Sequence, residues 1–433
     1  MRIVQKYGGT SVGSLARIRA VAERCLAARA AGVEELVVVV SAMAGETDRL
    51  IGLSNRLLAG EEGRGETKAG VAWVAPSATG NQDYERELSQ LISTGEKVSA
   101  ALVAMAINAS GGSAVSMVGH QLGMRTDAKF TNARIRDIKV DRIERALSEG
   151  RIVVCAGFQG LDDEGNITTL GRGGSDTSAV ALAAAVKADV CEILTDVDGV
   201  YTTDPRIVPS ARKLDRIAHE EMLELASLGA KVLQIRSVEF AMKHDVALHV
   251  RSSLNQNEGT WIVAETKDME SVVVRGVALE RNEAKITITN CPDVPGTVAS
   301  VFETLGAAGI IVDMIIQNAS RNEQTDVTFT VPRPDCERTE QLLRELPLVQ
   351  REGVEVLTDD EIAKISIVGV GMRTHAGVAA RAFKILASEN VNIQMVSTSE
   401  IKVSVVVDER YGELALRALH DGFGLDEAPA SPE

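Results

Sequence analysis

The chain begins MRIVQKYGGTS (residues 1–11), and this stretch decides how the first half of the sequence is interpreted. A short aliphatic segment, Ile3–Gln5, leads into Lys6 and then into the pair Gly8 and Gly9. Glycines let backbone N–H groups approach a bound group closely, and the lysine at the strand end adds a positive charge. We interpret the stretch as a strand followed by a phosphate-binding turn. A tight strand-to-helix turn without a ligand is the simpler alternative, and two glycines alone do not exclude it.

Short aliphatic runs alternate with amphipathic helical segments up to about residue 260, which is typical of a mostly parallel sheet covered on both faces. Ligands of such sheets bind at the carboxyl ends of the strands, so the loops after these strands are where we expect the site. Residues 59–83, rich in glycine, interrupt the pattern and are expected to form a mobile surface loop. Strands are predicted at residues 3–5, 36–40, 114–117, 152–155, 192–195 and 247–250.

A second glycine-rich loop, GRGGSDT at residues 171–177, precedes a helical segment of small residues. An arginine among glycines can bind a carboxylate through two hydrogen bonds, and the helix start adds N–H donors. Alternatively, Ser175 and Asp176 merely cap the helix. A third loop, residues 195–205, carries three aspartates without the spacing of a calcium loop, which also fits an ordinary turn.

The last part of the chain contains a duplication. AKITI at residues 284–288 resembles AKISI at residues 363–367, and Gly296 and Gly377, 81 residues apart, each open an apolar helix. Each copy reads strand, glycine loop, helix, strand, strand, helix, strand, which is the ferredoxin-like order. A short strand at residues 272–278 precedes the first copy, and we expect it to pair with the second.

Composition and missing motifs exclude several classes of function. The chain has 46 Lys and Arg against 61 Asp and Glu, a net charge of −15, and 3% aromatic residues, which argues against nucleic acids and anionic membranes. Its five cysteines form no C-x-x-C pair and its six histidines show no metal-binding spacing, so a cytoplasmic protein without its own metal site is expected. No Walker motif, G-x-G-x-x-G or G-x-S-x-G occurs.

Six motifs, taken in order, resemble those of aspartate kinases, which have the amino acid kinase fold, and the duplicated tail resembles their paired ACT domains. The motifs are KYGGTS (6–11), SAM (41–43), STGE (93–96), GFQG (157–160), TTLGRGGSD (168–176) and TDVDGVY (195–201). The resemblance implies an α/β catalytic domain over residues 1–268. It implies a first ACT domain over 283–353, and a second one formed by 269–282 and 354–433.

The resemblance further implies transfer of the γ-phosphoryl group of ATP, with Mg²⁺ carried by the nucleotide, to the side-chain carboxylate of L-aspartate. It assigns catalytic roles to Lys6, Glu96, Asp176 and Lys231. It assigns substrate binding to Thr47, Phe158, Arg172, Gly173, Gly174 and Ser175. Nucleotide binding falls to Lys6, Tyr7, Gly8, Gly9, Ser41, Thr195, Asp196, Tyr201, Asp204, Pro205, Arg206, Lys231 and Val232.

In the tail, the resemblance implies feedback inhibition by lysine, threonine or both, in a homo-oligomer that associates through ACT domains. Effector binding is assigned to Asp293, Gly296, Thr297, Ile311, Val312, Asp313, Gln317, Val378, Ala379, Asn392, Ile393 and Glu400. Ala379 replaces a hydroxyl residue that relatives can carry, so a purely structural second copy is an equal alternative. Two further alternatives stay open: a kinase for acetylglutamate, glutamate or uridylate, and an amino-acid sensor with an inactive kinase domain.

Overall fold

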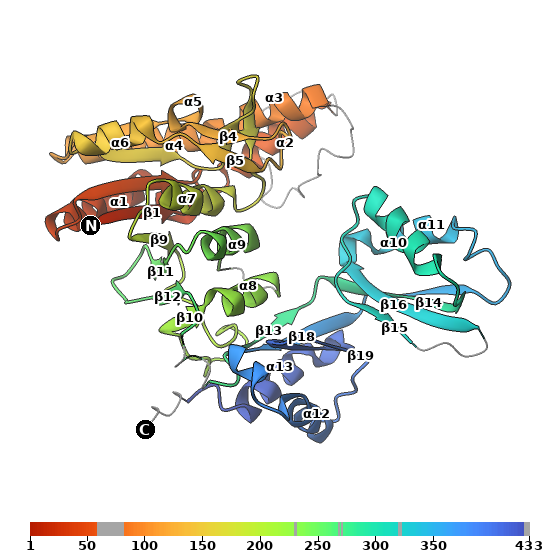
Figure 1. Ribbon diagram of the computed structural model, residues 1–433. Helices are drawn as coiled ribbons and strands as arrows, with labels where there is room; N and C mark the ends of the chain where they lie inside the picture. Colours follow the sequence, from red (N-terminus) through yellow and green to blue (C-terminus); the bar gives the residue numbers. More distant parts are fainter. Residues whose placement is uncertain (59–81, 229–231, 267–268, 270–271, 319–322, 428–433) are drawn as a thin grey trace. The chain divides into compact units, whose positions relative to one another are not determined.

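The structure is a computed structural model that describes residues 1–58, 82–228, 232–266, 269, 272–318 and 323–427 (Figure 1). Its contacts divide the chain into two units, which are described separately. The first contains Met1–Val200, Lys213–Ala226 and Lys231–Thr266. The second contains Tyr201–Arg212, Ser227–Ala230 and Lys267–Glu433.

An eight-stranded, mostly parallel sheet forms the centre of the first unit, in the order β10-β12-β11-β9-β1-β2-β6-β3. The strand β12 runs antiparallel to β11, whereas β1, β2, β3, β6, β9 and β11 pair in parallel. All six predicted strands are present, and β10 and β12 at one edge are additional. The bounds are β1 Arg2–Tyr7, β2 Glu35–Val40, β3 Ala114–Met117, β6 Ile152–Ala156, β9 Val190–Thr195, β10 Arg216–Ala218, β11 Leu248–Ser252 and β12 Thr260–Val263.

Helices cover both faces of this sheet. On one face, α1 (Leu15–Ala30) and α4 (Thr94–Ala109) share a core with Ile3 and Tyr7 of β1. Side chains alternate along a strand, so Lys6 faces away from that core. The opposite face is covered by α7 (Gly174–Ala185), which contacts β1, β2 and β9 and is buried along nearly its whole length. Lys6 is therefore directed toward α7.

A smaller four-stranded sheet, in the order β5-β4-β7-β8, adjoins the helices α3 and α5. The sequence pattern missed it because its strands are only three or four residues long. Of the predicted loop 59–83, residues 59–81 lie outside the described residues, and the prediction was wrong for residues 82 and 83, which open α3. The bounds are β4 Met124–Thr126, β5 Ile135–Ile138, β7 Gln159–Leu161, β8 Ile167–Thr169, α2 Glu46–Leu58, α3 Gln82–Ile92, α5 Gly119–Leu122, α6 Asp141–Ser148, α8 His219–Ser227 and α9 Ile235–Lys243.

The second unit contains two antiparallel sheets of four strands, ordered β15-β16-β14-β17 and β13-β18-β20-β19 (Figure 1). Each sheet has two helices, as the ferredoxin-like pattern predicted. The second sheet takes its edge strand β13 from before the first repeat, with Gly276 paired to Val368, which confirms the expected pairing. The bounds are β13 Gly276–Glu280, β14 Glu283–Pro292, α10 Thr297–Ala307, β15 Ile315–Gln317, β16 Gln324–Pro332, α11 Cys336–Arg344, β17 Glu355–Asp359, β18 Ile362–Val368, α12 Val378–Ser388, β19 Met395–Thr398, β20 Lys402–Asp408 and α13 Gly412–Gly422.

Residues 201–212 belong to this second unit although they follow β9 in the chain. The hydroxyl of Thr202 lies 2.9 Å from Nε2 of His420, and the N–H of Val277 donates to the Thr202 carbonyl at 2.8 Å. Val208 lies in the core of the second repeat. Within the described parts of the chain, no helix is long and apolar enough to span a membrane.

Candidate active site

The turn after β1 is closely packed. The N–H of Gly8 donates to the Leu194 carbonyl at 3.2 Å, and the N–H of Ala44 donates to the Gly9 carbonyl at 3.2 Å. A Cβ at Gly9 would lie 2.8 Å from the carbonyl oxygen of Ala42, so this position requires glycine. The strand β1 lies between β2 and β9, where the strand order reverses direction. This is the position at which open α/β sheets form a ligand-binding crevice.

Lys6 and Asp176 form an ion pair at this position. The distance from Lys6 Nζ to Asp176 Oδ1 is 2.5 Å, and both side chains are nearly buried, with 11% and 12% of their surface exposed. Asp176 lies in the first turn of α7, which follows Gly173 and has no side-chain cap. The capping alternative is therefore wrong for Asp176, whose carboxylate binds Lys6. A cation and two glycines thus lie together at the crevice.

Glu96, in the first turn of α4, is the second buried acid of the crevice. It is 3% exposed, and its Oε1 accepts a hydrogen bond of 3.0 Å from the N–H of Ala42. Its Oε2 is buried and has no hydrogen-bond partner among the described residues. Burial raises the pKa of Glu96 to about 7, against the hydrogen bond from Ala42 that lowers it. Such an unpaired oxygen is suited to a donor from a ligand.

Lys97, the neighbour of Glu96, was missed by the sequence interpretation. Burial lowers the pKa of its ammonium group, and the charge of Glu96 partly opposes that shift. The ammonium group of Lys97 is therefore close enough to Glu96 for the two charges to interact. The position of Lys97 next to Glu96 in the sequence was the one feature from which an interaction with Glu96 could have been predicted.

The loop before α7 presents Arg172 to solvent. Gly171 and Gly173, on either side of it, have φ values of 77° and 69°, in the left-handed region that favours glycine. Arg172 is exposed and has no ion-pair partner among the described residues. The loop is anchored by Arg236, which donates to the carbonyls of Leu170 at 2.6 Å and Ala133 at 2.8 Å. Arg236 carries no local sequence signal, so it was missed.

Phe158 fixes the other side of this loop. Its φ of 69° is unusual for a non-glycine residue, and two hydrogen bonds secure it. Its N–H donates to Ser178 Oγ at 3.0 Å, and its carbonyl accepts from the N–H of Leu170 at 2.9 Å. The ring packs in the core of α2 and α3, and a Cβ at Gly174 would lie 2.8 Å from it. Thr47 is half-buried in the first turn of α2, one of the two helices whose core contains the Phe158 ring.

The residues predicted for the nucleotide divide into four groups. Lys6, Gly8, Gly9, Ser41, Thr195 and Asp196 lie at or just after the ends of β1, β2 and β9. The Tyr7 side chain is fully buried in the core, where its hydroxyl donates to Gln5 Oε1 at 3.1 Å, so any role in the crevice falls to its backbone. Lys231 lies outside the described residues, and Val232 is half-buried. Tyr201, Asp204, Pro205 and Arg206 belong to the second unit, where Arg206 pairs with Asp204 at 2.6 Å.

Three of the predicted effector residues of the first repeat, Asp293, Gly296 and Thr297, lie at or just before the start of α10. Asp293 is exposed and has no ion-pair partner in the described parts of the chain, and Gly296 precedes α10 with a φ of 98° and no side-chain cap. The carboxylate of Asp313 is paired with the ammonium of Lys364 from the second repeat. Of the two acids predicted in the effector site of the first repeat, Asp293 is therefore the one without an ion-pair partner among the described residues. Among the other predicted residues of this repeat, Thr297 and Val312 are half-buried, and Ile311 and Gln317 are exposed.

The predicted effector residues of the second repeat differ in exposure. Val378 is buried, Ala379 and Ile393 are half-buried, and Asn392 and Glu400 are exposed.

Comparison with known proteins gives the family. The amino acid kinase family profile matches residues 1–252, and ACT domain profiles match residues 285–346 and 365–423. An aspartokinase of Pseudomonas aeruginosa is 53% identical over 430 residues, covering 99% of this chain and 98% of its own. The chain belongs to the aspartate kinase family. An aspartate kinase of Stutzerimonas stutzeri is 52% identical over 429 residues, with 99% and 98% coverage.

Solved structures of the family agree with the fold. The chain is similar to E. coli aspartokinase III in complex with aspartate and ADP, with 28% identity, a TM-score of 0.76, and coverage of 98% of this chain and 99% of that one. The same enzyme in complex with lysine and aspartate matches at 28% identity with a TM-score of 0.72 and the same coverage. The predicted fold class, an amino acid kinase domain followed by two ACT domains, is confirmed.

Proposed function

We propose that the chain transfers the γ-phosphoryl group of ATP to the side-chain carboxylate of L-aspartate, giving ADP and 4-phospho-L-aspartate. The observation that carries the proposal is the Lys6–Asp176 pair beside Gly8 and Gly9, at the sheet position where strand order reverses. It rests also on full-length similarity to aspartate kinases.

The crevice fits a nucleotide phosphate beside Lys6. A Cβ at Gly8 would lie 3.6 Å from Lys6 Nζ, so the missing side chain leaves space next to the ammonium group. Gly8, Gly9 and Ser41 would surround the phosphates, with Thr195 and Asp196 at the end of the neighbouring strand, and Lys231 and Val232 on the nucleotide side. Tyr201, Asp204, Pro205 and Arg206 remain proposed nucleotide residues. Mg²⁺, when bound, would neutralise phosphate charge and be held mainly by phosphate oxygens and water.

The aspartate would be held by its α-carboxylate and its ammonium group. The exposed guanidinium of Arg172 has no ion-pair partner among the described residues and can bind the carboxylate through two hydrogen bonds. The buried Oε2 of Glu96 would accept a hydrogen bond from the ammonium, and ionised Glu96 would neutralise its charge. Thr47, Phe158, Gly173, Gly174 and Ser175 would shape the pocket between these two anchors.

No general base is required for this reaction. The aspartate side chain is already ionised at pH 7, so its oxygen attacks the γ-phosphorus directly. The bond from that phosphorus to the bridging oxygen breaks, and its electron pair leaves with ADP. Lys6 stabilises the negative charge of the transferring group, and Asp176 keeps the lysine ammonium in position. Catalysis is therefore alignment and charge neutralisation.

The tail would regulate this activity. An amino acid at the start of α10 would place its carboxylate on the free N–H groups there and its ammonium on Asp293. Lysine, threonine or both are the proposed inhibitors, since the E. coli relative was solved with lysine. The oligomer is proposed to form through ACT domains. The proposed domain limits are 1–268, 283–353, and 269–282 with 354–433.

The experiment that tests the proposal measures ADP release from ATP with four acceptors in parallel. Aspartate should support turnover, and glutamate, acetylglutamate and UMP should not. Turnover with one of the other three would assign the chain to a different amino acid kinase activity. Absence of turnover with all four would favour the amino-acid sensor.

A further inference from the structure

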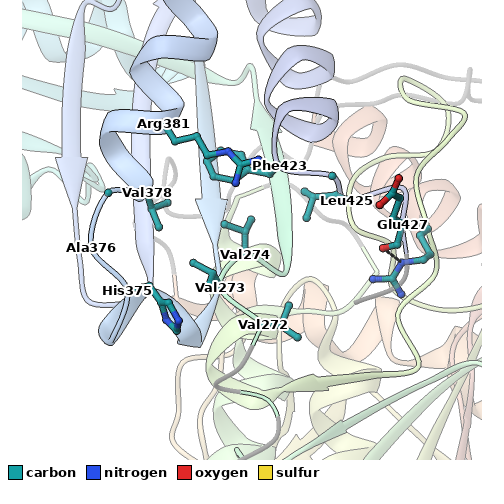
Figure 2. A pocket seen from close by; sticks show the side chains of 13 residues that line it. Val272, Val273, Val274, His375, Ala376, Val378, Arg381, Phe423, Leu425 and Glu427 are labelled. Atoms are coloured by element: carbon teal, nitrogen blue, oxygen red, sulfur yellow. Dashed lines mark hydrogen bonds between the residues drawn. The ribbon is translucent and has the colours of Figure 1, made fainter. Parts of the chain in front are cut away.

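The second unit contains a cavity of about 440 Å³ beside the start of α12 (Figure 2). Its walls come from residues just before β13, from the loop between β18 and α12, and from the chain after α13. It lies on the β13 side of the sheet. Val378, one of the predicted effector residues of this repeat, lines it, whereas those predicted at 392, 393 and 400 flank the opposite edge strand, β19. Its volume falls in the range of small-molecule sites.

One wall of the cavity is apolar. Val273 and Val274 lie opposite Val378, with Leu425 beside them (Figure 2). Val274, Val378 and Leu425 are 7%, 9% and 6% exposed, so they form a fixed surface. This wall suits a hydrocarbon or aromatic body.

The remaining lining is polar and includes two arginines, Arg212 and Arg381. Arg381 lies 5.0 Å over the ring of Phe423 and donates to the Gly422 carbonyl at 2.7 Å, which fixes its guanidinium and leaves its other N–H donors available. Nδ1 of His375 lies 2.8 Å from the Gly371 carbonyl, which leaves Nε2 for another partner. At the start of α12, Gly377 provides no side-chain cap. Among the described residues that line the cavity, Glu427 is the one acid, and its carbonyl accepts a hydrogen bond from Arg212 Nε at 3.1 Å.

The duplication shows how the charge changed between the two repeats. At a spacing of 81 residues, Asp293, Val294 and Ser300 of the first copy correspond to Thr374, His375 and Arg381 of the second. An acid is lost, and an arginine and a histidine are gained. The second loop is therefore unsuited to an ammonium ligand and suited to an anion.

We propose that this cavity binds a small organic anion, distinct from the amino-acid effector of the first repeat. A carboxylate or phosphate headgroup lies against Arg381, His375 and the first N–H groups of α12. An apolar body lies against Val273, Val274 and Leu425.

The test uses the full chain and isothermal titration with phenyl phosphate and phenylacetate, which separate the two headgroups. Inorganic phosphate and benzyl alcohol supply the headgroup and the body alone. At least one of the organic anions should bind about tenfold more tightly than either part. The variant Arg381→Gln should weaken that binding about tenfold or more. Arg417→Gln, on α13 outside the cavity and paired with Glu413, is the matched control and should bind normally.

Two results would overturn the proposal. One is no binding of either organic anion at millimolar concentration to the unmodified chain. The other is equal binding to Arg381→Gln, which would assign the anion to another site. Circular dichroism and ADP release check that Arg381→Gln is folded, and if it is not, His375→Ala replaces it with the same expected loss of affinity.

Discussion

Acidification should weaken the binding of aspartate through Glu96. This side chain is buried and hydrogen-bonded to Ala42, and its other oxygen has no partner among the described residues. Burial raises its pKa to about 7. Above that pH the ionised group neutralises the ammonium of aspartate, and below it the protonated group carries no charge. The charges of aspartate itself change little between pH 6 and 8.

The raised pKa of Glu96 sets the size of the effect on KM. A group with a pKa of about 7 is roughly 90% ionised at pH 8 and roughly 10% ionised at pH 6. If only the ionised form binds aspartate, KM for aspartate should be about tenfold higher at pH 6 than at pH 8. kcat should change much less, because Glu96 does not contact the transferring phosphoryl group in the proposed arrangement.

The assay is ADP release at saturating ATP, with aspartate titrated at half-unit steps from pH 6 to pH 8. Glu96→Gln should raise KM at pH 8 and remove the dependence on pH. Glu23→Gln, an exposed glutamate on α1, is the matched control and should retain the unmodified profile. A Glu96→Gln profile that still rises tenfold toward pH 6 would refute the assignment of this titration to Glu96.

The same variant should be more stable than the unmodified chain. The pKa of Glu96 is higher in the folded protein than its ordinary value of 4.5, so folding stability falls as the pH rises from about 4.5 to about 7. At pH 8 the charged, buried form costs up to about 3 kcal/mol, which Gln does not incur. Urea unfolding at pH 8 measures this difference, and equal or lower stability of Glu96→Gln would contradict the cost of burial.

Four further predictions concern single side chains. Lys6→Ala should lower kcat about 100-fold or more with circular dichroism unchanged, and near-normal kcat would reject its role at the transferring group. Arg172→Ala should raise KM for aspartate with a smaller effect on kcat, whereas a change confined to KM for ATP would place it on the nucleotide side. Gly173→Ala should destabilise the fold by at least about 1–2 kcal/mol in urea unfolding, because φ is 69° and a Cβ would lie 1.6 Å from Gln234 Cγ; wild-type stability would disprove the clash. Asp293→Ala should preserve activity and weaken inhibition by lysine and threonine, titrated singly and together, and unchanged inhibition would move the effector site elsewhere.

Patterns that recur along the chain made much of the fold predictable. The central strands are continuous aliphatic runs, so all six were found, and the two repeats were visible because AKITI and AKISI recur with their glycine turns. The strands of the small sheet were missed because three or four residues carry no usable periodicity. The edge strand of the second repeat was predictable because residues 272–278 form a strand-like run that precedes the first copy and is not part of it.

For the site, residues in glycine-rich motifs were predictable and their supports were not. Lys6 and Asp176 stand in separate motifs, and the alternation of β1 brings them to within 2.5 Å. Arg236 reaches the loop around Arg172 from a helix more than 60 residues away in the chain, which no local pattern indicates. The pairing of Lys364 with Asp313 joins the two repeats and likewise follows from tertiary packing alone.

The most direct test of the proposed reaction is to identify its product. Incubation with ATP, Mg²⁺ and aspartate in the presence of hydroxylamine should convert an acyl phosphate into aspartyl β-hydroxamate, formed in a one-to-one ratio with ADP. The Lys6→Ala variant should form neither product at a comparable rate. ADP formed without hydroxamate would contradict phosphorylation of the aspartate side chain. The same would follow if another acid, added in place of aspartate, gave hydroxamate and aspartate did not.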